Sequence, residues 1–196
     1  PAEFEADLGY PGAPAGHDKP GGGTPRRLLY AYSRSELFRD WATGTQVGDY
    51  LRMLFGRDDV YMSQCHHNCV MTKHPGHSST TMWHQDIRYW SFDRPELISV
   101  WLALGRETER NGALQIIPGS HKMDIDRGRL DSALFLRPEL EQNRQIIEQA
   151  ESMELEPGDV LFFHCRSFHA AGRNLTGDGR RAHDAGRFRR RPATAQ

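Results

Sequence analysis

The region from Val60 to His164 is a succession of short apolar runs that are separated by turn-forming residues. The runs cover about 60–64, 67–73, 81–88, 97–104, 113–117, 153–156 and 160–164. Gly, Pro and Asn lie between them, and short strands with this punctuation are typical of all-β sandwiches and barrels. The sequence therefore predicts a mainly β domain, either a sandwich or a jelly roll.

The first 59 residues have a different character, a loop followed by helices. Residues 11–25 are rich in Pro and Gly and carry no periodic apolar pattern, so they predict a loop. Segments 35–41 and 45–55 carry apolar side chains at helical spacing and predict two helices. One further helix is expected at 138–151, inside the β region, where Pro138 suits the first turn.

The composition is that of a globular chain without a general affinity for polyanions or membranes. Of the 196 residues, 37% are hydrophobic and 26% are charged, and the formal net charge is −1. A nearly neutral chain gives no reason to expect nucleic acid or an anionic membrane as a partner. No apolar stretch approaches the ~20 residues that a membrane span needs. The length predicts a single domain, and the oligomeric state stays open.

Cysteine usage bears on location and on metal binding. The cysteines are Cys65, Cys69 and Cys165, odd in number and without a disulfide pattern. We therefore expect a reducing, cytoplasmic location. The stretch 65–77 also holds four histidines, so a zinc site is a second interpretation of it. Two thiols four residues apart on a strand would lack the usual zinc-knuckle turn, which argues against that interpretation.

One motif has the geometry of a metal-chelating pair. His84 and Asp86 are two residues apart, so on a strand both side chains would point to the same face. His169 lies downstream, after the apolar run 160–164. Two histidines and one carboxylate supply three ligands on one face of a metal and leave the opposite face open. This is the arrangement of non-haem iron(II) oxygenases.

Two further runs and an arginine accompany this motif. Residues 111–121 predict a turn, a short buried strand and a Pro-Gly turn, and residues 156–164 predict a turn that leads into an apolar strand. Arg180 lies eleven residues after His169. A buried arginine offers a rigid two-pronged donor for a carboxylate, so Arg180 is a candidate anchor for a dicarboxylic co-substrate.

Together these motifs resemble the phytanoyl-CoA dioxygenase family of Fe(II)- and 2-oxoglutarate-dependent oxygenases. The resemblance covers roughly Val60 to Arg181, and its matching pieces are His84-Gln85-Asp86, Asn111-Gly112, Pro118-Gly119-Ser120-His121, Pro157-Gly158-Asp159 and the segment from His169 through Gly172 and Asn174 to Arg180. It implies a double-stranded β-helix core, the cupin-like jelly roll, at 60–181, with helices flanking it on the N-terminal side.

The resemblance also implies roles for particular residues. It assigns three iron ligands, which are His84, Asp86 and His169. It assigns the distal carboxylate of 2-oxoglutarate to Arg180, with Arg181 as a close competitor. Lys73 and Trp101 lie on strands where the family contacts the co-substrate, although a surface lysine and a core tryptophan are the alternatives. The implied reaction uses O2 to hydroxylate an unactivated C–H bond of a small molecule, with release of succinate and CO2; desaturation and the identity of the substrate stay open.

The sequence departs from the family at its C-terminal end. After Arg181 a strand should close the barrel, whereas residues 182–196 are polar and basic and predict a basic tail. This departure keeps two other functions in view. One is a jelly-roll binding protein without turnover, and the other is a metalloenzyme that uses no keto-acid co-substrate.

Overall fold

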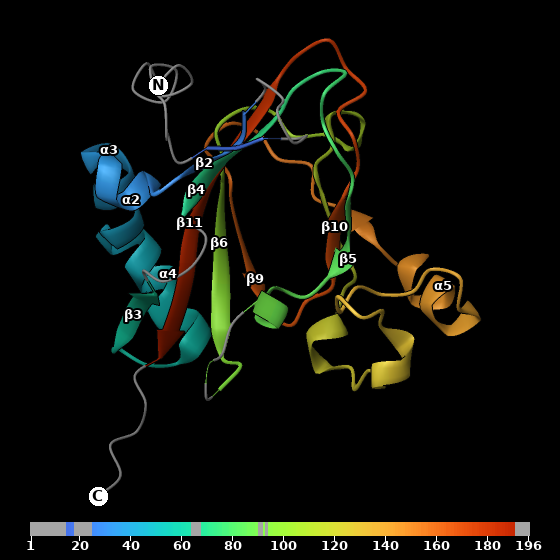
Figure 1. Cartoon of the computed structure of the whole chain (residues 1–196). Coiled ribbons are helices and arrows are strands. Elements are labelled where there is room, and N and C mark those ends of the chain that lie inside the picture. Colours follow the sequence, from blue (N-terminus) through green and yellow to red (C-terminus); the bar gives the residue numbers. More distant parts are fainter. Residues whose placement is uncertain (1–14, 18–24, 64–67, 90–91, 93, 191–196) are drawn as a thin grey trace, which may run out of the picture.

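Two facing β-sheets form the body of the molecule (Figure 1). The computed structural model describes residues 15–17, 25–63, 68–89, 92 and 94–190. The larger sheet has the order β1-β2-β4-β11-β6-β9, with β3 paired to β11, and the smaller sheet has the order β5-β10-β7-β8. The strands are β1 (Ala15–His17), β2 (Pro25–Leu29), β3 (Val60–Ser63), β4 (Cys69–Lys73), β5 (Thr81–His84), β6 (Leu97–Ala103), β7 (Leu114–Ile116), β8 (Glu151–Ser152), β9 (Val160–His164), β10 (His169–Ala171) and β11 (Arg180–Arg190).

Strand β6 is buried on both faces and joins two cores. Ile98 and Val100 pack against residues of the N-terminal helices, whereas Trp101 packs between the sheets with Leu114 of β7 and Ala171 of β10. A strand that is covered on both sides needs apolar residues at successive positions, which explains the near-continuous apolar run of β6. Each large apolar side chain buried in this way contributes about 1.5–3 kcal/mol.

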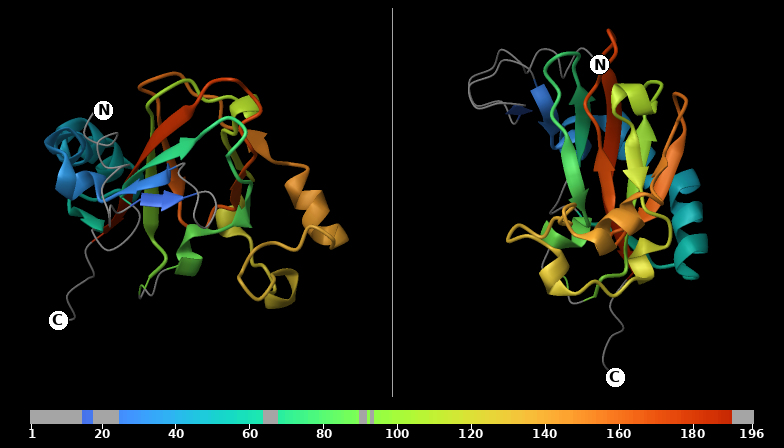
Figure 2. Two further views of the ribbon diagram at one scale, coloured as in Figure 1. Left: turned by 45° about the horizontal axis from the view of Figure 1, so that its top comes forward. Right: turned by 90° about the vertical axis from the view of Figure 1, so that its right-hand side faces the viewer.

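The N-terminal helices within residues 31–55 cover the outer face of the larger sheet, whereas the helix at 141–147 lies beside the smaller sheet (Figures 1 and 2). The N-terminal helix predicted at 45–55 is confirmed as α4, and Gly56 ends it at φ 64° while its N–H bonds the carbonyls of Arg52 and Met53. Glycine reaches this left-handed conformation without a steric penalty. No helix within the described residues has the length and apolar character that crossing a bilayer needs. The α-helices are α2 (Ala31–Arg34), α3 (Glu36–Thr43), α4 (Thr45–Phe55) and α5 (Glu141–Ile147), and the 3-10 helices are η2 (Asp86–Tyr89), η3 (Glu109–Asn111), η4 (Ser120–Lys122) and η5 (Arg127–Arg129).

Several predicted boundaries differ from the structure. The strand expected at 81–88 ends at His84, and Asp86 begins η2. The run 153–156 forms an isolated bridge to Glu107 rather than a strand. The predicted loop 11–25 contains β1, while 11–14 and 18–24 lie outside the described residues. The predicted runs 60–64, 67–73, 97–104, 113–117 and 160–164 contain β3, β4, β6, β7 and β9.

The prediction of a basic tail from 182 onward is wrong for residues 182–190. They continue β11, which begins at Arg180 and pairs with β4 and β6 on its two edges and with β3 further along. A strand paired on both edges gains its ladder hydrogen bonds whatever its side chains are. Ala182 is fully buried against the inter-sheet core, so the strand that the family resemblance requires after Arg181 is present. Residues 191–196 lie outside the described residues.

The Asn-Gly turn of the family motif packs against the segment that leaves β10. Gly112 has φ 83°, and a Cβ placed there would lie 2.6 Å from the carbonyl oxygen of Gly172 and 2.9 Å from Cδ of Lys73. Glycine at this position therefore permits both the backbone conformation and the close approach. The turn brings the ends of β4, β7 and β10 together at one side of the site.

Candidate metal centre

The three predicted metal ligands converge at the smaller sheet. His84 is the last residue of β5 and His169 the first of β10, and the two are register partners across an antiparallel pair. Their ring centroids are 4.3 Å apart. Asp86 follows at the start of η2, and its Oδ1 lies 3.6 Å from Nε2 of His169. In the part of the chain that the structure describes, this is the one group of three whose ligand atoms all lie within 4.8 Å of one another.

The route by which Asp86 reaches the site differs from the prediction. The two-residue spacing was expected to place His84 and Asp86 on one face of a strand, but the strand ends between them. The turn into η2 brings the carboxylate to the histidines instead. The spacing is thus compatible with chelation, although a strand is not what provides it.

Both histidine rings are fixed by the same local hydrogen bond. Nδ1 of His84 lies 2.8 Å from the carbonyl oxygen of Met82, and Nδ1 of His169 lies 3.0 Å from that of Ser167. A carbonyl oxygen accepts but cannot donate, so each Nδ1 carries the proton. The lone pair of each neutral ring is then on Nε2, which is the usual arrangement for a metal-binding histidine.

The site is buried, and burial favours the ligating form of His84. His84, Asp86 and His169 are 6%, 3% and 5% exposed. Burial, followed by the charge of His169, lowers the pKa of His84 to about 3. The ring is therefore neutral near pH 7, and a metal has no proton to displace from it. Phe163 meets the His169 ring edge-on at 5.1 Å and supplies an apolar wall.

Ser99 orients the carboxylate, and sequence reasoning missed it. Its hydroxyl donates to Oδ2 of Asp86 at 2.9 Å, and both residues are buried. The one feature of the sequence that could have indicated Ser99 is its hydroxyl, which stands alone in the apolar run of β6. A serine at such a position is common in strands without any such role, so the run alone did not single it out.

We expect Ser99→Ala to weaken iron(II) binding by about 10- to 100-fold, because outer-shell hydrogen bonds orient metal ligands. The dissociation constant is measured anaerobically by competition with a coloured chelator. Ser132→Ala, at an exposed position, serves as the matched control and should leave the constant unchanged. Equal affinities in the two variants would show that the hydroxyl does not tune the site.

Lys73 and Trp101 both have protein partners in the structure. Lys73 is buried, and its ammonium donates to the carbonyls of Ser79 at 3.0 Å and of Gly172, so it is not a surface lysine. The indole N–H of Trp101 donates to Oε1 of the buried Glu107 at 2.9 Å. Contacts of Lys73 and Trp101 with a co-substrate stay predictions.

Strand register separates the two candidate arginines. Arg180 is the register partner of Lys73, and Arg181 that of Thr72. Successive strand positions alternate between faces, so position 180 shares a face with Ala182. Ala182 is buried between the two sheets. Position 180 therefore belongs to the inner face, on the same side of the sheet as the predicted metal ligands, and position 181 belongs to the other face.

The zinc interpretation of 65–77 gains no support. Cys65, His66 and His67 lie outside the described residues. Cys69 is buried, with its sulfur 3.4 Å from that of Met71. The cysteine therefore packs as an apolar side chain in β4.

Comparisons with known proteins agree with this geometry. The family model described as phytanoyl-CoA dioxygenase matches residues 23–182. The ectoine dioxygenase of Sphingopyxis alaskensis is 25% identical over 168 residues, which is 77% of this chain and 53% of that protein. Human peroxisomal phytanoyl-CoA dioxygenase is 27% identical, covering 75% and 44%. The dioxygenase lolE1 of Epichloe uncinata is 33% identical, covering 74% and 51%.

Solved structures show the same fold. EctD from S. alaskensis with 2-oxoglutarate and 5-hydroxyectoine superposes with a TM-score of 0.73 at 21% identity, covering 95% of this chain and 62% of that one. The form with bound Fe gives 0.72 at 22% identity, covering 94% and 62%. The predicted cupin-like fold class is confirmed. The chain spans about half the length of the relatives that it matches. Because the family model matches most of the sequence, the chain belongs to the phytanoyl-CoA dioxygenase family.

Proposed function

We propose that this protein is an iron(II)- and 2-oxoglutarate-dependent dioxygenase that oxidises a small molecule. One observation carries the proposal. Two imidazoles and a carboxylate, all buried, bring their ligand atoms within 4.8 Å of one another in a member of this family. The ligand residues are His84, Asp86 and His169.

The donor set fits ferrous iron. Two neutral nitrogen donors and one carboxylate on one side of an ion leave positions for a chelating co-substrate and for O2. Bound iron would supply the oxidative decarboxylation of 2-oxoglutarate, coupled to oxidation of a C–H bond, with succinate and CO2 as products. The chain itself orients the ligands: the Met82 and Ser167 carbonyls fix the rings, and the Ser99 hydroxyl fixes Asp86.

We place the distal carboxylate of 2-oxoglutarate at Arg180. Its register partner Lys73 adds a second cation at the same end of the site, and the contacts of Lys73 with the carbonyls of Ser79 and Gly172 hold that end together. Trp101 lies one strand away, on β6, in the inter-sheet core. In the cytoplasm, the compartment that we propose, the buried thiols of Cys69 and Cys165 would stay reduced.

The test is iron-dependent formation of succinate. The protein is loaded with Fe(II) under anaerobic conditions, mixed with 2-oxoglutarate and air, and assayed for succinate with and without ectoine and phytanoyl-CoA, the compounds that the relatives' names suggest. We expect succinate above that of a zinc-loaded control, and stimulation by an accepted substrate. Iron-loaded protein that forms no succinate with or without these compounds would favour the jelly-roll binding protein instead.

A further inference from the structure

A cation lies one aromatic ring away from a proposed iron ligand. Arg88 in η2 is half-buried, and its guanidinium carbon is 3.7 Å from the centroid of the Phe135 ring. That ring meets the His84 ring edge-on, with 5.8 Å between centroids. A guanidinium stacked on a ring face directs its N–H donors outward, in the plane.

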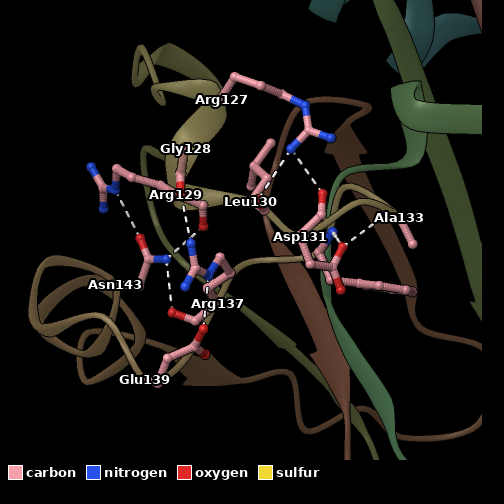
Figure 3. Close-up of polar contacts among 10 residues, drawn as sticks. Arg127, Gly128, Arg129, Leu130, Asp131, Ala133, Arg137, Glu139 and Asn143 are labelled. Atoms are coloured by element: carbon pink, nitrogen blue, oxygen red, sulfur yellow. Dashed lines mark hydrogen bonds and ion pairs between the residues drawn. The ribbon is translucent and has the colours of Figure 1, made fainter.

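Phe135 lies against His84 and belongs to a turn built around Asp131, whose contacts with Arg127 and Ala133 are visible in Figure 3. The carboxylate of Asp131 accepts from the backbone N–H of Ala133 at 2.8 Å and of Phe135 at 2.9 Å. The backbone N–H of Asp131 donates to the carbonyl of Phe135 at 2.9 Å. The Arg127 guanidinium then holds the Asp131 carbonyl at 2.8 Å. Hydrogen bonds within residues 131–135 therefore close the turn, Arg127 adds one from outside it, and the ring position is preformed.

The segment that carries Phe135 is also tied to β5. The N–H of Leu136 donates to the carbonyl of Trp83, the residue before His84, at 2.9 Å. Further along, the side chain of the fully buried Asn143 accepts from Nε of Arg129 and donates to the Arg129 carbonyl, both at 2.8 Å (Figure 3). A wall fixed in this way can set where a ligand lies relative to the metal.

Arg88 and Lys73, the register partner of the proposed anchor Arg180, lie near opposite ends of β5. Lys73 contacts the carbonyl of Ala171, which is the register partner of Thr81 at the start of β5. His84 ends β5, and Arg88 follows it in η2. His84 therefore lies between the end of β5 that is next to Lys73 and the residue Arg88.

We propose that Arg88, seated on Phe135, binds an oxyanion of the substrate, a carboxylate or a phosphate, and thereby selects acidic small molecules. The inference rests on the proposed function, because it assigns the remaining end of the same site. The anion fixes one end of the substrate, and Phe135 sets the distance from that end to the bond that is oxidised. A binding site that hydrogen-bonds a polar group of its substrate strongly rejects an analogue without that group, because the polar atoms of the protein are then left unpaired.

The test measures binding to the iron-loaded protein with saturating 2-oxoglutarate under anaerobic conditions, so that the co-substrate site is filled and no turnover occurs. The probes are matched pairs: benzoate and benzamide, octanoate and octanamide, phenyl phosphate and phenol. In calorimetry, the acid of the carboxylate pairs or of the phosphate pair should bind at least about tenfold more tightly than its neutral partner. The pair that shows this preference identifies the anion.

Arg88→Gln should weaken acid binding by about 10- to 100-fold, and Arg88→Lys by less. Arg94→Gln, at an exposed position nearby, is the control.

Three results would overturn the inference: equal affinity for acids and neutral partners, no binding of any acidic probe at millimolar concentration, or undiminished acid binding by Arg88→Gln. The comparison of acids with neutral partners uses the wild-type protein, so it decides the matter even if a variant fails to fold. Iron content and succinate formation are measured on the same preparations. Wild-type protein that neither holds iron nor forms succinate would contradict the proposed function itself. Wild-type protein that does both but does not prefer acids would contradict only the role proposed for Arg88.

Discussion

Replacement of His169 by alanine is expected to abolish iron binding, and His84→Ala and Asp86→Ala are expected to do the same. Each change deletes one of three ligand atoms that lie within 4.8 Å of one another. Two remaining ligands hold a labile ferrous ion poorly against water, so the affinity should fall by more than the ~10–100-fold that loss of an outer-shell hydrogen bond costs. Iron per protein after anaerobic loading and desalting gives the result, and thermal stabilisation by Fe(II) provides an independent readout.

Two further variants separate ligand loss from general damage. Asp86→Asn keeps the shape of the side chain, but its single oxygen cannot both accept from Ser99 and face His169, so loss of iron in this variant would report the missing carboxylate and not a missing volume. His77→Ala removes an exposed histidine and should retain iron. Full iron content and turnover in His169→Ala would refute the assignment of that ligand.

The parts of the fold that the sequence predicts well are those whose signal is local. Helix α4 has the predicted bounds because its apolar spacing and Gly56 both act within a few residues. Strand β6 is recognisable because burial on both faces requires an apolar run. In each case neighbouring residues carry the information.

Strand β11 escaped prediction because its signal is not local. Its ladders with β3, β4 and β6 join residues far apart in sequence, and backbone pairing does not depend on an apolar pattern. A single buried residue such as Ala182 is too little for a periodicity argument. The polar and basic composition of 182–190 therefore predicted a tail where the topology places a central strand.

The residues of the candidate metal centre could be predicted, but not all of what surrounds them. The spacing of His84 and Asp86 marks a chelating pair whether a strand or a turn carries it, so the triad was found although its local structure was not. Ser99 and Phe135 reach the site from other elements, and their neighbours in sequence do not distinguish them. Only the folded arrangement identifies such residues.

Arg180→Ala is expected to raise the KM for 2-oxoglutarate on the order of 100-fold, because loss of a charged, two-pronged hydrogen bond to a carboxylate removes roughly 3 kcal/mol of binding. The iron content should be unchanged, since none of the three ligands is altered. KM and kcat are measured from the succinate formed over a range of 2-oxoglutarate concentrations. Arg180→Lys should recover part of the loss, because it restores the charge without the planar donor.

Arg181→Ala is the matched control, because it removes the same kind of side chain one position further along the same strand. Register pairs 180 with Lys73 and 181 with Thr72, so alternation puts the two positions on opposite faces of the larger sheet. The KM should therefore change by less than about threefold in Arg181→Ala, the range expected for a substitution away from the site. A larger effect at 181 than at 180 would reverse the assignment of faces. Full activity in Arg180→Ala would favour a metalloenzyme that uses no keto-acid co-substrate, because such a reaction has no second carboxylate to anchor.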